Sequence, residues 1–426
     1  MGISDKGEIK LNVHLYRVLR KANRYVKKRR KINAGFIMSP TRRIELVAPP
    51  AQRVCAMTFD DGPTAAPCIP FTKDNQGLTA HLLDVLNQHD ARATFNVIGS
   101  TAENYPDAPG RLGSSYTFGT RYDHYACYGL DHMAGALACP DLLKRIVTDG
   151  HEIANHGFRH ILYGPEYFVY RKRRFFASLD EVVADLARLH DLVKAETGYE
   201  ITMARPPHYV DRIGRLGGAN AYTAYARCGY HYMAARMDAG GWMPTSGDYK
   251  KDVDTMVQAL ETKLKHNPDA LSGAVISQKD GYNLSMESPV ACALGLQLGL
   301  LESYGYKVVG VGELMGYSPF EDVGPGDEGF EAVRALDQAG YVIGFQNNQF
   351  KPGEPVTGEQ LAAMCTGKGG FVPRRCVDRR ALSVLEIAAV IGEMIGPVEK
   401  LNGSTRQDAA MAVWDAVVNA AAPALC

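Results

Sequence analysis

The chain has 426 residues, of which 46% are hydrophobic and 22% charged, a composition typical of folded protein and unlike that of an extensively disordered one. Lysine plus arginine equals aspartate plus glutamate, 47 each, so the overall charge gives no basis for nucleic-acid binding. There is no run of about 18 apolar residues and no apolar stretch behind the first charges, so neither a membrane-spanning helix nor a signal peptide is predicted.

Residues 1–50 are predicted to form a basic N-terminal segment. Its first 31 residues carry eleven basic and two acidic side chains, and apolar residues recur at helical spacing between Leu11 and Val26. This pattern predicts a cationic amphipathic helix. Two interpretations are open: peripheral contact with an anionic surface, such as lipid head groups or wall polymer, or packing on the protein itself with a solvated basic face.

The cysteines do not indicate a disulfide framework. There are nine of them, an odd number, and no two are spaced as CxxC. We expect most to be buried thiols. In an exported protein, Cys127 could pair with Cys139, or Cys365 with Cys376.

Residues 51–316 are predicted to form one α/β domain, because short apolar strands alternate with amphipathic helices. We expect a distorted (β/α) barrel of about seven strands, whose chemistry lies at the carboxyl ends of the strands. Residues 100–138 lack periodicity and are predicted to be a loop insertion, either a substrate wall or a surface excursion. The predicted strands span residues 54–59, 93–98, 152–155, 203–204, 230–234, 274–277 and 307–311.

Two adjacent carboxylates, Asp60 and Asp61, end the first of these strands. Burying unpaired carboxylates is costly, so something must neutralise them, and a metal ion is the leading candidate. Further along, His156 and His160 lie four positions apart, which on a helical turn would bring both imidazoles to one point. One carboxylate and two histidines, with a position left open for water, describe a catalytic metal site.

These residues resemble the motifs of the polysaccharide deacetylase family, carbohydrate esterases of family four, over about residues 51–316. The matching segments are Thr58-Phe59-Asp60-Asp61-Gly62-Pro63, Ala93 to Gly99, Asn155-His156 to His160, Arg205-Pro206-Pro207 and Asp248-Tyr249.

The resemblance implies a role for each matching residue. Asp61, His156 and His160 would bind one divalent metal ion, with zinc as the first candidate. Asp60 would be the general base that activates the attacking water, and Arg205 its charge partner. A set of further residues would complete the site: a backbone N–H near His208 and Tyr209 for the oxyanion, and Asp248 from the fourth motif.

Three positions depart from the family pattern. Gly157 stands where the family has a hydroxyl residue, and His208 where it has tyrosine. The family's Leu-His-Asp aligns with Gln278-Lys279-Asp280, so Lys279 replaces the histidine that protonates the leaving amine. Lys279 is interpreted either as a substitute acid or as a solvated lysine beside a slowed site.

Residues 317–426 are predicted to form a small all-α repeat domain. The stretch from Phe320 to Met364 resembles an S-layer homology repeat, and a shorter second copy covers residues 385–394 and 404–410. The resemblance implies binding to a secondary cell-wall polymer through Arg406. The alternative is a degenerate helical domain that only packs.

The resemblance therefore implies a metal-dependent hydrolase that removes N-acetyl groups from a cell-wall polysaccharide, either peptidoglycan or a chitin-like glycan. Two other hypotheses are open: a catalytically impaired wall-binding protein, and an esterase acting on O-acetyl xylan, whose better leaving group needs less acid assistance. The resemblance implies a location at the cell surface or wall. Because no signal peptide is visible, a cytoplasmic location also stays open.

Overall fold

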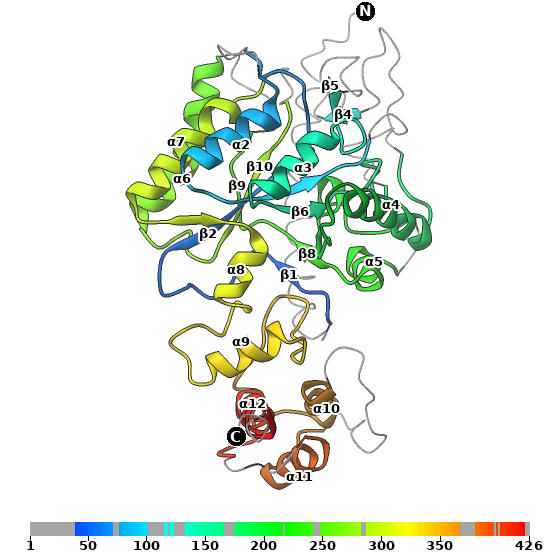
Figure 1. Cartoon of the computed structure of the whole chain (residues 1–426), viewed down its shortest axis with the longest axis vertical. Coiled ribbons are helices and arrows are strands. Elements are labelled where there is room, and N and C mark those ends of the chain that lie inside the picture. Colours follow the sequence, from blue (N-terminus) through cyan, green and yellow to red (C-terminus); the bar gives the residue numbers. More distant parts are fainter. Residues whose placement is uncertain are drawn as a thin grey trace, which may run out of the picture. The chain divides into compact units, whose positions relative to one another are not determined.

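The structure is a computed structural model of the whole chain (Figure 1). It describes residues 39–70, 76–100, 115–117, 120–122, 133–165, 174–215, 218–241, 248–282, 287–366, 380–395, 398 and 401–421. The predicted N-terminal helix, Cys127 and Cys376 lie outside these residues. Among the helices that are described, none is long and apolar enough to cross a membrane.

The described chain forms two compact units, each treated by itself below. The first contains residues 43–45 and 53–311, and the second contains residues 39–42, 46–52 and everything from Gly312 onward. The predicted boundaries were residues 50 and 316. In the structure, residues 46–52 group with the C-terminal unit, and that unit begins again at Gly312.

A parallel sheet is the centre of the first unit and has nine strands. Its order is β1 (Arg43–Ile44), β8 (His231–Met233), β7 (Met203–Ala204), β6 (Glu152–Asn155), β3 (Thr94–Val97), β2 (Val54–Asp60), β10 (Val275–Lys279) and β9 (Met237–Asp238), and β11 (Lys307–Val309) also pairs with β2. The N–H of Val275 donates a hydrogen bond to the carbonyl of Glu45 at 3.1 Å, which links β10 to the end of β1. The predicted α/β barrel is confirmed, with two short strands, β1 and β9, added to the predicted seven.

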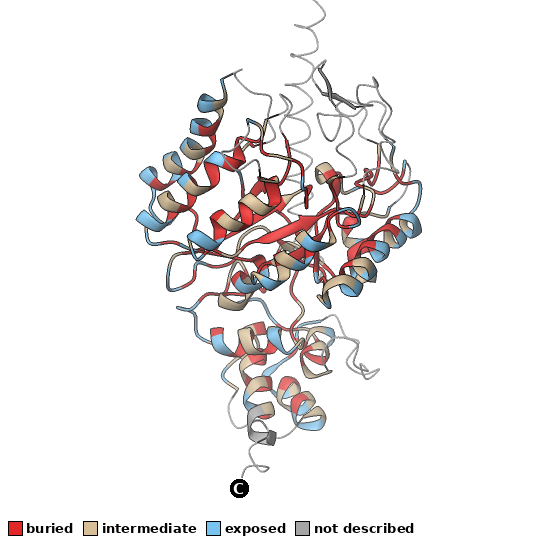
Figure 2. Ribbon diagram, turned by 45° about the horizontal axis from the view of Figure 1, so that its top comes forward, coloured by how far each residue is buried: buried red, intermediate tan, exposed pale blue. Residues whose placement is uncertain are grey.

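Helices cover the sheet and bury their apolar faces on it. They are α2 (Leu78–Gln88), α3 (Pro140–Thr148), α4 (Leu179–Thr197), α5 (Ala221–Cys228), α6 (Tyr249–His266) and α7 (Val290–Ser303), and α8 (Val311–Tyr317) begins at the last residue of the unit. Figure 2 shows buried residues on the sheet and on the facing sides of the helices, with exposed residues on the outer sides.

Strand β2 lies near the middle of this sheet and has the sequence Val-Cys-Ala-Met-Thr-Phe-Asp, buried at every position but the last. A strand covered on both faces needs such a continuous apolar run. Its Phe59 ring stacks on Phe95 of β3 with ring centroids 5.1 Å apart. The polar residue at the end of β2 is therefore delivered to the carboxyl edge of the sheet by a rigid, buried element.

The predicted loop insertion at residues 100–138 is described only in part. Within it, β4 (Ser115–Thr117) and β5 (Thr120–Tyr122) pair as two antiparallel strands. The interpretation of this insertion as a substrate wall stays a prediction.

The second unit is helical, as expected. It contains α9 (Phe330–Gln338), α10 (Gly358–Thr366), α11 (Val384–Met394) and α12 (Arg406–Ala421) around a core that includes Phe320, Phe350 and Val413.

Three of these helices, α10, α11 and α12, begin with the same kind of reciprocal cap, which Ser383 and Glu386 form at α11. The Thr357 hydroxyl accepts from the N–H of Gln360, whose amide oxygen accepts from the N–H of Thr357. Thr405 and Asp408 exchange equivalent hydrogen bonds. Such capping boxes satisfy two N–H groups that a helix start leaves open. Because α11 has this cap as well, the interpretation of residues 404–410 as part of a second copy stays a prediction.

Candidate active site

Neighbouring parallel strands bring the candidate residues together at the carboxyl edge of the sheet. In register, Asp60 of β2 lies opposite Asn96 of β3, and Val97 of β3 lies opposite Asn155 of β6. Asp61 and His156 each follow the last residue of their strand. Residues separated by almost a hundred positions in the sequence are thereby placed side by side, as the fold predicts for parallel sheets.

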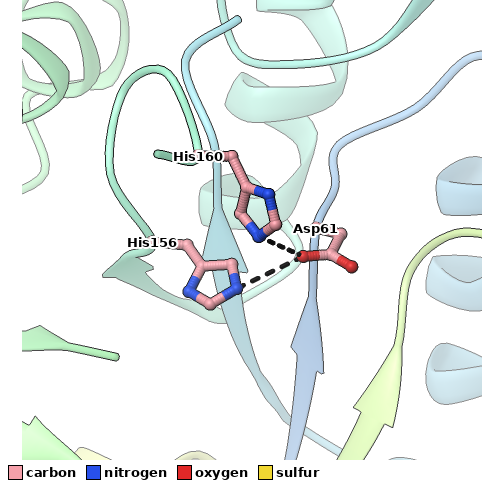
Figure 3. Close-up of side chains that lie close together, drawn as sticks. All are labelled: Asp61, His156 and His160. Carbon is pink, nitrogen blue, oxygen red and sulfur yellow. Dashed lines mark ion pairs between the residues drawn. The ribbon is translucent and has the colours of Figure 1, made fainter. Parts of the chain in front are cut away.

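Asp61, His156 and His160 form one buried cluster (Figure 3). Asp61 Oδ1 lies 3.2 Å from His156 Nε2 and 3.1 Å from His160 Nε2. Each residue offers one ligand atom, and these atoms all lie within 4.8 Å of one another. One oxygen and two imidazole nitrogens at such separations form a donor set able to hold a metal ion.

The position of the proton on the His156 imidazole bears on whether these residues can bind a cation. His156 Nδ1 lies 2.8 Å from the Arg205 carbonyl oxygen, which only accepts, so Nδ1 carries the proton. In a neutral imidazole, Nε2 then presents a lone pair to the carboxylate oxygen of Asp61. Two acceptors facing each other in a buried place call for a positive charge, either an imidazolium or a metal ion, so the donor set fits a metal.

The two histidines do not share a helical turn, so that prediction is wrong. Residues 156–160 form a loop in which Gly157 has φ 85° and His160 has φ 51°. Both values lie in the left-handed region, which turns the chain back within three residues. The imidazoles converge because the loop reverses, and glycine at position 157 adopts this conformation without steric cost.

Asp60 is paired as the family resemblance implied. Arg205 Nη1 and Asn96 Nδ2 both donate to Asp60 Oδ1, the latter at 3.2 Å. The Arg205 side chain is fully buried, and its other donors reach Thr58 Oγ1 at 3.0 Å and the carbonyl of Ala234 at 3.2 Å. Asp60 therefore has a buried guanidinium as its direct ion-pair partner.

Lys279 is the last residue of β10, opposite Asp60 in the register. Its ammonium donates a hydrogen bond to Asp61 Oδ2, the oxygen that does not face the histidines. Lys279 is therefore an internal ion-pair partner of the candidate metal ligand rather than a solvated lysine. Behind it, burial and the nearby Asp61 raise the pKa of Asp280 to about 7, and Thr79 Oγ1 donates to this carboxyl group at 2.7 Å.

The turn Pro207–Tyr209 places His208 beside the cluster, with its ring centroid 5.1 Å from that of His160. The N–H of Tyr209 donates to the carbonyl of Pro206 at 2.9 Å. The turn itself occupies that N–H, and an oxyanion contact by a backbone N–H near His208 stays a prediction. Burial raises the pKa of the Tyr209 phenol to about 12, so Tyr209 stays neutral.

Asp248 caps a helix. It is exposed at the start of α6, and its carboxylate accepts from the N–H of Lys251 at 3.3 Å. This contact is structural, and a catalytic role for Asp248 stays a prediction. A different acidic residue, Asp238, ends β9 next to β10, in the register position opposite Ser277. Asp238 was not predicted, because no strand was expected at residues 237–238.

A second residue that sequence reasoning missed is Asp185 of α4. Its carboxylate is buried and accepts hydrogen bonds from the loop that joins the two histidines. A signal was present, since position 185 falls on the apolar stripe that includes Val182 and Leu189. An acid on such a stripe has a buried partner as a rule.

Arg406 of the second unit is buried, in contrast to its predicted contact with a wall polymer. Its Nε donates to the carbonyl of Phe350 at 2.6 Å and its Nη2 to that of Ile343 at 3.0 Å. Burial lowers the pKa of Arg406 to about 10, although Glu354 and Asp322 act in the opposite direction. The position favours a structural role that ties the loop before α10 to the start of α12.

Comparison with known families agrees with this geometry. Residues 48–232 match the model of the polysaccharide deacetylase family, and residues 319–362 match the S-layer homology domain. The chain therefore contains a polysaccharide deacetylase domain, followed in the sequence by an S-layer homology domain. The deacetylase match ends before β10, so Lys279 lies outside it.

Individual relatives are distant. A peptidoglycan-N-acetylglucosamine deacetylase from Listeria monocytogenes is 22% identical over 67% of this chain and 44% of its own length. A chitin deacetylase from Colletotrichum lindemuthianum is 24% identical over 62% of this chain and 80% of its own. The chain thus spans less than half the length of the Listeria protein. Among solved structures, peptidoglycan deacetylase PdaC from Bacillus subtilis aligns with a TM-score of 0.40 at 21% identity, over 63% of this chain and 92% of that one.

Proposed function

We propose that the first unit is a metal-dependent hydrolase that removes N-acetyl groups from a cell-wall polysaccharide. The observation that carries the proposal is the buried cluster of Asp61, His156 and His160, set beside the ion pair of Asp60 with Arg205. The peptidoglycan and chitin deacetylases among the relatives support an N-acetylated glycan as the substrate.

One divalent ion, with zinc as the first candidate, would be held by Asp61, His156 and His160 and would polarise the acetyl carbonyl and lower the pKa of a nearby water. His156 is prepared for this role, because the bond from its Nδ1 to the Arg205 carbonyl fixes the tautomer and aims Nε2 at the cluster. Arg205 thus supports both halves of the site, through its carbonyl and through its guanidinium.

The residues divide the hydrolysis between them. Asp60 accepts a proton from water as the water oxygen bonds to the acetyl carbon. A backbone N–H near His208 is the candidate to stabilise the oxygen that becomes negative. The bond from carbon to nitrogen then breaks, the amine leaves with one added proton, and acetate is released. Lys279 is the candidate donor of that proton, since its ammonium is held at the edge of the cluster by Asp61.

The experiment is acetate release from N-acetylated glycan oligomers by the metal-loaded protein, with chelator-treated protein as the control. We expect release that is lost on chelation and restored by added zinc. A metal-loaded protein that releases no acetate from peptidoglycan fragments, chitin oligomers or acetylated xylan would contradict any hydrolase function.

A second candidate is an esterase acting on O-acetyl groups of xylan. The ion pair of Lys279 with Asp61 favours it, because the ammonium that would protonate the leaving group is already bound to a carboxylate. An alkoxide is a better leaving group than an amine anion and needs less acid assistance. Faster release of acetate from acetylated xylan than from chitin oligomers would select this candidate.

We further propose that the second unit holds the protein at the cell wall by binding a secondary wall polymer, which places the protein at the cell surface. The match to the S-layer homology domain supports this. Sedimentation of the full chain with purified walls, before and after the secondary polymer is extracted from them, tests it. Equal sedimentation with extracted walls would contradict polymer binding. A contact of residues 1–31 with an anionic surface stays a prediction.

A further inference from the structure

The loop that carries the two histidines has no hydroxyl side chain of its own to brace it, because Gly157 follows His156. Its bracing comes from α4 instead. Asp185 Oδ2 accepts from the N–H of Phe158 at 2.8 Å and from that of Arg159 at 3.4 Å, while Oδ1 accepts from Arg159 Nε at 2.7 Å. One buried carboxylate therefore receives three donors from two consecutive residues between the histidines.

We infer that Asp185 is a positioning residue that sets the separation of His156 and His160 and thereby the affinity of the site for its metal ion. Asp185 lies on a helix, which is more rigid than a loop, and its side chain is 4% exposed. The inference rests on the metal site of the proposed function, but it concerns metal binding and not the reaction.

Hydrogen bonds from the other end of the loop complete the brace. Asn155 Oδ1 accepts from the N–H of Gly157 at 2.9 Å, and Asn155 Nδ2 donates to the carbonyl of Leu186, also on α4, at 2.8 Å. The loop is thus fastened to adjacent residues of one helix on both sides of its turn. Each histidine is within two residues of a fastened backbone N–H.

Close packing makes the carboxylate hard to replace. A side-chain carbon at position 157 would lie 3.2 Å from Asp185 Oδ2, so the loop backbone comes as near to the carboxylate as glycine allows. Asparagine at position 185 has the same shape as aspartate, but its side-chain NH₂ group would face N–H groups of the loop. Donor facing donor in a buried site is unfavourable, so the loop would shift rather than keep its place.

The test compares Asp185→Asn with Asp191→Asn, which changes an exposed carboxylate on the same helix. Zinc affinity is measured by competition with a chromophoric chelator, and the coordination geometry from the visible absorption of the cobalt-substituted proteins. We expect Asp185→Asn to bind zinc about tenfold or more weakly and to change the cobalt spectrum, since partners that orient ligands typically matter by this much. Asp191→Asn should match the unchanged protein in both.

A role in stability alone would lower the unfolding temperature of Asp185→Asn without changing the zinc affinity or the cobalt spectrum of the folded protein, and that result would overturn the inference. If Asp185→Asn does not fold, Arg159→Gln removes only the side-chain half of the brace and should weaken zinc binding by a smaller factor; unchanged binding would likewise overturn it. Failure of the unchanged protein to bind zinc would instead reject the proposed metal site.

Discussion

Lys279 brings a positive charge to a carboxylate that also faces two histidines. The charge of its ammonium opposes the approach of a divalent cation to Asp61, because like charges at short range repel strongly inside a protein. The same ammonium orients Asp61 so that one oxygen faces the histidines. The lysine thus has two opposing effects: its charge weakens metal binding, and its hydrogen bond orients the metal ligand Asp61.

We predict that Lys279→Gln binds zinc more tightly than the unchanged protein, by about tenfold if the repulsion is on the order of 1.4 kcal/mol. Glutamine can still donate a hydrogen bond to Asp61 Oδ2, so the geometry is kept while the charge is removed. Isothermal titration with zinc at low metal occupancy measures the change. Weaker binding would mean that orientation by the charged lysine outweighs its repulsion.

Replacement of Lys279 by histidine separates the substrate hypotheses. Imidazole gives up a proton more readily than an ammonium near neutral pH, so Lys279→His should raise acetate release from N-acetylated oligomers. Release from O-acetylated xylan should change little, because the ester depends less on an acid. Rates on both substrates, with zinc loading matched, give the comparison. An unchanged ratio of the two rates would show that proton donation by residue 279 does not limit turnover.

At the scale of single elements, a histidine that the fold keeps neutral lies directly before strand β6. Burial lowers the pKa of His151 to about 4, with the Arg92 charge acting in the same direction. The N–H of Ala93 donates to His151 Nδ1 at 3.2 Å, which requires an unprotonated nitrogen. The unfolded chain regains the ordinary pKa of about 6.5.

Between pH 6.5 and about 4, His151 therefore binds a proton in the unfolded state but not in the folded state. The free energy of unfolding falls as the pH falls through this window. The contribution of His151 is on the order of 2 kcal/mol and is complete above pH 6.5. We predict that His151→Gln has a shallower decline in unfolding free energy between pH 7 and pH 4.5. Urea unfolding in the presence of a chelator measures it, and the difference between the two proteins removes the contributions of His156 and His160. Parallel declines would contradict a neutral His151.

The elements could be predicted to different degrees. Six of the seven predicted strands have at least three residues and were readable as apolar runs, whereas β1 and β9 have two residues each and show no pattern. The cluster of Asp61, His156 and His160 was predicted from the motifs. The prediction placed the two histidines on a helical turn, whereas the chain forms a loop there. The partner of Lys279 was beyond sequence reasoning, because the contact joins β10 to the end of β2.

At the scale of the whole molecule, the candidate active site and the stretch that matches the S-layer homology domain lie in different units. The first unit contains every residue of the candidate active site, and the second has its own core with Phe320, Phe350 and Val413. Arg406 was predicted to bind a ligand because Thr405-Arg406 resembles the ligand-binding element of S-layer homology repeats, whereas in the structure its side chain is buried. Substitutions in either unit should therefore act on that unit's own property.

We predict that Arg406→Ala lowers the thermal stability of the second unit without changing zinc affinity. The substitution leaves the carbonyls of Phe350 and Ile343 without their donor and opens a cavity, together worth about 3 kcal/mol or more. Limited proteolysis on a temperature ramp locates the loss, and zinc titration at low temperature provides the control. Normal stability together with lost sedimentation on walls would instead support direct polymer contact by Arg406.

The backbone at Asp61, with φ 82°, bears on how an inactive protein for substrate trapping is best made. Alanine at this position would remove the ligand and also be held in a conformation that L residues other than asparagine and aspartate seldom adopt. Asparagine keeps the shape and tolerates the left-handed conformation. Asp61→Asn is therefore the variant expected to stay folded with little metal, and crystals of it soaked with glycan oligomers offer a view of the uncleaved substrate.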